Sequence, residues 1–120
     1  MKRNNNIDFQ SVNQSEELEI QTSSIRLVAK CWGNPDGLPV LAFHGWLDNA
    51  ATFDNLAPLL PELRIISLDL PGHGHSDHRP SGSAYYFIDM VMDVIEVADV
   101  LGLENFNLLG HSMGAGVATY

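Results

Sequence analysis

The stretch that decides the fold is NFNLLGHSMGAGVATY, residues 105–120. Residues 105–109 form a short apolar run that predicts a strand, and residues 113–120 are typical of the beginning of a helix. Between them stands GHSMG, residues 110–114, which fits the pattern G-x-S-x-G. In a strand–turn–helix setting this pattern predicts a sharp turn with a serine at its tip.

Small residues are needed on both sides of such a serine. Gly110 and Gly114 stand two positions before and two positions after Ser112, where neighbouring backbone passes close by and a Cβ would collide. The turn places Ser112 at the start of a helix, so the N–H of Met113 is expected to face an oxyanion formed beside the serine hydroxyl. We predict Ser112 as a nucleophile; the alternative is a small-residue turn without chemistry.

A second motif follows the apolar run Val40–Phe43, which predicts a buried parallel strand. His44, Gly45 and Trp46 come directly after it. These residues resemble the loop of the α/β-hydrolase fold that carries a second oxyanion donor after this strand. On that resemblance, Gly45 would let the loop turn so that the backbone N–H of Trp46 joins that of Met113 as a donor, and His44 is predicted to support the loop by a hydrogen bond. The alternative is a plain strand-end loop with a packed tryptophan.

Strands and helices alternate along the chain. Predicted strands span residues 17–22, 25–32, 40–43, 64–70 and 105–109, the first two as an antiparallel hairpin. Predicted helices are a short one near Ala50 capped by Asp48 or Asn49, a long one from about Ser83 to Leu101 ended by Gly102, and one from Met113. This order predicts an α/β fold: a mostly parallel sheet with an antiparallel N-terminal hairpin and helices on both faces.

A histidine-rich segment follows the strand 64–70. His73, His75 and His78 lie near Asp69 and Asp77, and a metal site is one interpretation because imidazole and carboxylate both bind zinc or iron. The glycines and prolines of the segment favour a shaped loop instead. In that interpretation His73 hydrogen-bonds backbone, and Asp69 fixes the end of the strand.

Two further groups of polar residues have simple interpretations. Asp89, Asp93 and Glu96 share one side of the predicted long helix and are expected to form its solvated face. His111 directly precedes Ser112, and strand alternation predicts that its side chain points away from the serine hydroxyl.

Composition excludes several classes of protein. The 120 residues include 15 Asp or Glu against 6 Lys or Arg, for a net charge of −9, and 45% are hydrophobic. The apolar content excludes a disordered acidic tail, and the negative charge argues against nucleic-acid binding. The single cysteine excludes a disulfide scaffold and a cysteine-based zinc site. No apolar run approaches the roughly 20 residues needed to span a bilayer.

The N-terminus carries no secretion signal, because Lys2 and Arg3 are followed by polar residues instead of an apolar run. We therefore expect a cytoplasmic protein. Residues 1–16, rich in Asn, Gln and Ser, are predicted to be a loose leader. The sequence carries no signal for a particular oligomeric state.

Residues 38–120 resemble the N-terminal part of the α/β-hydrolase fold. The motifs HGW (44–46), DLPGHGHSD (69–77) and GHSMG (110–114) occur in the order and separation of that family. Within it, HGWLDNAATFDNLAPLLP and the serine turn are most similar to the serine hydrolase-like proteins. On this resemblance, residues 17–120 are a truncated α/β-hydrolase domain whose motif-bearing part is 38–120.

The resemblance implies a serine, an acid and a histidine in that chain order, and no metal or organic cofactor. It also implies hydrolysis of an ester, thioester or amide bond in a small molecule with an acyl group. Residues 113–120 contain no acid and no histidine. We therefore expect the full-length parent to be the hydrolase and this chain alone to be inactive. The alternative is a non-catalytic remnant or binding module that retains the front half of the fold.

Overall fold

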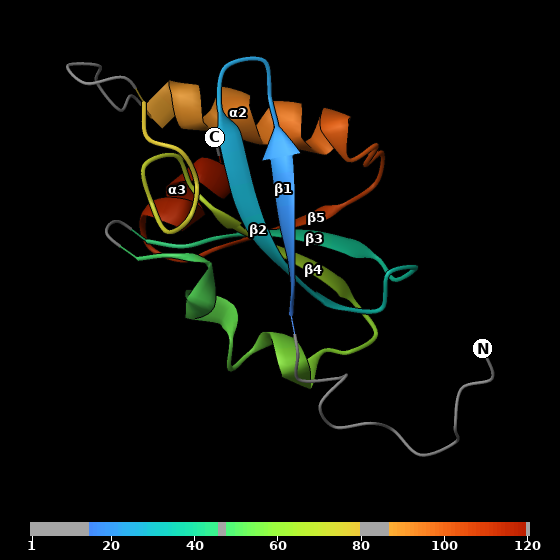
Figure 1. The fold of residues 1–120 in the computed structure, drawn as a ribbon. Helices are drawn as coiled ribbons and strands as arrows, with labels where there is room; N and C mark the ends of the chain where they lie inside the picture. The colour runs from blue at the N-terminus through green and yellow to red at the C-terminus, as the bar shows by residue number, and fades with distance from the viewer. Residues whose placement is uncertain (1–14, 46–47, 80–86, 120) are drawn as a thin grey trace.

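In a computed structural model, which describes residues 15–45, 48–79 and 87–119, five strands form a single sheet (Figure 1). The strands are β1 (Glu16–Gln21), β2 (Arg26–Gly33), β3 (Pro39–Phe43), β4 (Arg64–Asp69) and β5 (Asn107–Gly110). The helical elements are the 3₁₀ turns η1 (Ala50–Phe53) and η2 (Ala57–Leu59) and the α-helices α2 (Phe87–Val100) and α3 (Met113–Thr119). The predicted leader falls almost entirely outside the described residues.

The order of the strands across the sheet is β1-β2-β4-β3-β5. β1 and β2 form an antiparallel hairpin, β2 is antiparallel to β4, and β3 is parallel to both β4 and β5. Among the described strands β2 therefore runs against the other four, and the predicted α/β sheet with its N-terminal hairpin is confirmed. Because β3, β4 and β5 run in the same direction, their carboxyl ends and the loops that follow them lie on the same side of the sheet, at the ends of the strands.

Apolar side chains pack on both faces of this sheet. On one face, Leu27, Leu41, Phe43 and Leu68 pack with Met90, Val94, Val97 and Val117 of α2 and α3. On the other face, Trp32, Val40, Ala42 and Ile65 pack with Phe53 and Ala57 of η1 and η2. β3 and β4 contribute to both clusters, which explains their continuous apolar sequences. Helical elements cover both faces, as predicted.

The helical segments differ from the predictions in detail. The segment near Ala50 forms two short 3₁₀ turns instead of one helix; Asn49 is the N-cap, and its side chain accepts from the N–H of Ala51 at 2.8 Å. At the other end of the chain, Gly102 ends α2 with a φ of 67°, as predicted. Its N–H donates to Asp99 O and that of Leu103 to Ala98 O, which is the Schellman arrangement. The predicted start at Ser83 lies outside the described residues.

The acidic side of α2 is solvated only in part: Asp89 and Glu96 are partly exposed, whereas Asp93, which we also predicted to be solvated, is buried. Asp93 is 5% exposed and forms an ion pair with Arg79, with 2.5 Å between Oδ2 and Nη2. Burial raises the pKa of Asp93, and Arg79 opposes this effect. The helical period explains the error, because Asp93 stands three residues after Met90 and four before Val97, which face the core.

The ion pair between Arg79 and Asp93 fastens the loop after β4 to α2. Asp93→Ala is expected to lower the free energy of unfolding by on the order of 3 kcal/mol, because it removes this carboxylate from the guanidinium of Arg79, whose side chain is only 14% exposed. Asp99→Ala, at an exposed position of the same helix, is the control and should change it by less than about 0.5 kcal/mol. Urea unfolding measures both; equal effects would contradict this role of the ion pair.

Candidate active site

The turn between β5 and α3 has an unusual backbone. Ser112 is exposed and has a φ of 56°, the one positive φ among the non-glycine residues that the structure describes. Such a conformation stores on the order of 1–3 kcal/mol of strain and is found preferentially at functional sites. The N–H of His111 donates to Phe43 O at 3.0 Å, and that of Ala115 donates to Ser112 O at 3.0 Å. The serine is thus held between the end of a strand pair and the first turn of a helix.

The glycines beside the serine allow this turn to pack tightly. A Cβ on Gly110 would lie 2.5 Å from the Cα of Ala115. A Cβ on Gly114 would lie 2.5 Å from the carbonyl carbon of Phe43 and 2.7 Å from His44 O. These distances are shorter than any tolerated contact, so the steric reason given for the two glycines agrees with the structure.

The two motifs that are distant in sequence meet at this turn. Gly45 is buried, and a Cβ on it would lie 3.3 Å from the Cβ and 3.7 Å from the Oγ of Ser112. Met113 is the first residue of α3, and the first N–H groups of a helix have no partner within it. Trp46, the other predicted oxyanion donor, lies outside the described residues. The role of both N–H groups stays a prediction.

His44 connects the loop after β3 with the end of β4. Its side chain is completely buried; its Nε2 accepts from the N–H of Leu70 at 2.9 Å, so the proton is on Nδ1, which donates to Gly45 O at 2.7 Å. The N–H of Asp48 donates to the same oxygen at 3.2 Å. His44 therefore fixes the carbonyl of Gly45, and sequence reasoning missed its link to Leu70.

Burial lowers the pKa of His44 below its ordinary value of 6.5. The unfolded chain therefore takes up a proton at a higher pH than the folded chain does. Stability from this residue is complete above about pH 6.5 and decreases as the pH falls towards the folded pKa.

His44→Gln is expected to lower stability at about pH 7.5 by about 1–3 kcal/mol, because the flexible amide does not reproduce the geometry in which the imidazole ring bonds Leu70 N–H and Gly45 O together, and a buried polar group loses its partner. It should also reduce the loss of stability between about pH 6.5 and 5, because glutamine does not titrate. Urea unfolding over this pH range measures both effects, with His78→Gln, at an exposed histidine, as the control. An unchanged pH dependence would contradict the role of His44.

The histidine-rich segment forms a shaped loop, as favoured from the sequence. His73 Nδ1 donates to Pro71 O at 3.0 Å, and its ring centroid lies 4.9 Å from that of His44. Asp69 at the end of β4 accepts from the N–H of Ala50 at 2.7 Å and from that of His75 at 3.0 Å. Within the described ranges, no three His, Cys, Asp or Glu side chains are placed to hold a metal ion.

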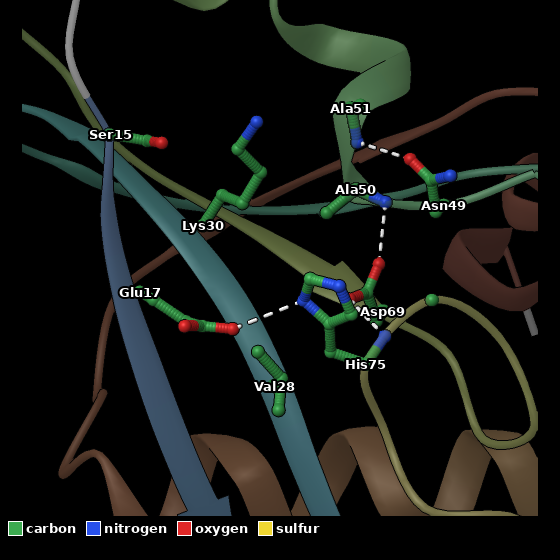
Figure 2. A pocket seen from close by; sticks show the side chains of 10 residues that line it. Ser15, Glu17, Val28, Lys30, Asn49, Ala50, Ala51, Asp69 and His75 are labelled. Carbon is green, nitrogen blue, oxygen red and sulfur yellow. Dashed lines mark hydrogen bonds and ion pairs between the residues drawn. The ribbon is translucent and has the colours of Figure 1, made fainter.

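A cavity of about 350 Å³ lies between β1, β2, η1 and the loop after β4 (Figure 2). Ser112 is not among the residues that line it. Its titratable side chains already have partners: His75 Nδ1 lies 3.2 Å from Glu17 Oε1, Lys30 Nζ donates to Asp54 at 2.8 Å, and Asp69 accepts from the backbone N–H groups of Ala50 and His75. We therefore place the candidate active site at the exposed Ser112 and not in this cavity.

His111, the remaining predicted site residue, is exposed, and the direction of its side chain stays a prediction.

Within the described residues, no helix has the length and apolarity required to cross a membrane.

Residues 39–120 match the family described as the alpha/beta hydrolase fold, and the chain belongs to this family. It is 44% identical over 123 residues to a serine hydrolase-like protein of Dictyostelium discoideum, covering 99% of this chain and 33% of the relative. It is 48% identical over 93 residues to a serine hydrolase-like protein of Danio rerio, covering 77% and 28%. The chain thus spans about a third of the length of these relatives.

Solved structures show the same architecture. A hypothetical protein of Pseudomonas aeruginosa PAO1 is 55% identical with a TM-score of 0.83, covering 86% of this chain and 36% of that one. A thioesterase domain from the curacin biosynthetic pathway is 30% identical with a TM-score of 0.81, covering 88% and 38%.

Proposed function

We propose that Ser112 is the nucleophile of a serine-dependent hydrolase that cleaves an ester, thioester or amide bond in a small molecule with an acyl group. The observation that carries the proposal is the exposed Ser112 at a φ of 56°, with Gly45 directly beside it. A strained, exposed serine between a strand and a helix is the arrangement used for nucleophilic attack in this fold. The serine hydrolase-like relatives and the thioesterase domain support the same class of reaction.

In the proposed reaction, Ser112 Oγ attacks the carbonyl carbon of the acyl group, and its proton passes to a histidine base. The carbonyl oxygen becomes negatively charged, and the N–H groups of Met113 and Trp46 donate hydrogen bonds to it. Removal of a single such donor lowers kcat by a factor of about 10²–10³. The leaving group takes the proton from the histidine, and water then hydrolyses the acyl-serine ester.

The base and its orienting acid are not supplied by residues 113–120, which contain no Asp, Glu or His. The buried His44 is an unsuitable base, because both of its ring nitrogens are occupied by backbone groups. The second candidate function is a non-catalytic binding module that retains this part of the fold. The enzyme hypothesis requires an acid and then a histidine encoded in frame after Tyr120, and reading the gene decides this point.

A fluorophosphonate probe, which reacts with activated serines, tests the proposal. A protein that contains this chain with an acid and a histidine after it should be labelled on the peptide that carries Ser112. The 120-residue chain should not be labelled at a catalytic rate. Failure to label the longer protein would contradict the nucleophile assignment, and rapid labelling of the short chain would contradict its expected inactivity.

A further inference from the structure

The side of α2 that points away from the sheet is apolar. Ile88, Met92 and Ile95 are 46%, 54% and 50% exposed, and their spacing of four and three residues aligns them along one face. The core-facing residues Met90 and Val97 lie on the opposite side of the same helix. A surface helix is normally polar on its solvent side, so α2 has a second apolar face. We call Ile88, Met92 and Ile95 the outer face of α2.

Negative charge surrounds the outer face. α2 contains four acidic residues and no Lys or Arg; Asp93 is buried and paired with Arg79, which leaves Asp89, Glu96 and Asp99 near its surface. Asp89 stands in the first turn of α2, and the last turn contains no basic residue, so the negative end of the helix dipole is not neutralised there. Asp99 is exposed close to this end. The carboxylate of Glu96 accepts hydrogen bonds from the backbone N–H of Ser23 at 2.7 Å and from its hydroxyl at 2.6 Å. The outer face is thus an apolar stripe with an acidic border.

We propose that the outer face of α2 docks a basic amphipathic helix of a partner protein. Apolar side chains of such a helix would pack on Ile88, Met92 and Ile95, and its flanking Lys or Arg side chains would meet the acidic border. A second copy of this chain fits poorly, because two such helices would bring their acidic residues together and each chain carries a net charge of −9. The proposal is independent of the chemistry at Ser112.

Two synthetic helical peptides of about 18 residues test the proposal. Both carry leucines at i, i+4 and i+7, flanked by lysines in one peptide and by glutamates in the other. Fluorescence anisotropy with the 120-residue chain should show that the lysine peptide binds at least about tenfold more tightly than the glutamate peptide. The difference should shrink in about 0.5 M salt, because salt screens exposed charges.

The triple variant Ile88→Gln/Met92→Gln/Ile95→Gln should weaken binding of the lysine peptide by about tenfold or more. Leu59→Gln, at an apolar position that is 73% exposed on η2, is the matched control and should bind normally. Circular dichroism and urea unfolding verify that all variants are folded. Equal affinity for the two peptides, or unchanged binding by the triple variant, would overturn the proposal.

Two further results would assign the outer face to another occupant and so overturn the proposal. The first is a dimer, seen by light scattering, that the triple variant abolishes; it would identify a second copy. The second is strong protection of residues 88–95 from hydrogen exchange in a longer protein containing this chain, without protection in the 120-residue chain. That result would identify a segment of the protein's own chain.

Discussion

Ser112→Ala is expected to reduce kcat by roughly a millionfold in a protein that combines this chain with its acid and histidine, because a triad without its serine retains little catalysis. KM should change much less, because the hydroxyl forms its covalent bond only after the substrate has bound. Stability should stay within about 0.5 kcal/mol of the unchanged protein, since alanine adopts the same backbone conformation with a side chain that also begins with a Cβ. Loss of activity without loss of stability would show that the substitution removes the catalytic step and leaves the folded state intact.

The measurement is hydrolysis of an activated ester and of an acyl thioester, together with fluorophosphonate labelling. Ser24→Ala, at an exposed position in the hairpin turn, is the matched control and should retain full activity. If the Ser112→Ala protein kept more than about one hundredth of the activity, the nucleophile would have to be another residue.

The turn was predictable because its motif is local in the sequence: Gly110, Ser112 and Gly114 are separated by single residues. A Cβ on Gly110 would meet Ala115 of the helix that follows, whereas a Cβ on Gly114 would meet Phe43 and His44 at the distant end of β3. The sheet was predictable for a similar reason. Its buried strands β3 and β4 are short apolar runs bounded by prolines, glycines or polar residues, which is how strands covered on both faces are recognised.

The parts that sequence reasoning missed depend on contacts between distant segments. The spacing of Asp93 from Met90 and Val97 places it beside the core, but its partner Arg79, which makes a buried carboxylate tolerable there, lies on a separate loop. Likewise, a hydrogen bond for His44 was expected, but the partner Leu70 is 26 residues away. The segment after Asn49 formed 3₁₀ turns because it is short and Pro58 lacks an N–H for a continuing helix.

The second large effect is expected at Gly114. Gly114→Ala should lower the free energy of unfolding by more than about 4 kcal/mol, because the added methyl group meets backbone atoms and not a movable side chain. Those atoms belong to Phe43 and His44, at the end of β3, which lies between β4 and β5 in the sheet. To accommodate the methyl group, α3 would have to move away from β3, and Ser112 would move away from Gly45.

Gly102→Ala is the matched control, because it separates backbone strain from steric overlap. Gly102 has a φ of 67°, and a Cβ there has no atom within 4 Å, so alanine should cost only about 1–2 kcal/mol. Urea unfolding, with the slope m compared as well as the midpoint, measures both variants. Insoluble Gly114→Ala beside soluble Gly102→Ala would also support the prediction, whereas equal losses would contradict it. In the longer protein, Gly114→Ala should then slow fluorophosphonate labelling even where it is folded, because the glycine holds the nucleophile against the loop that follows β3.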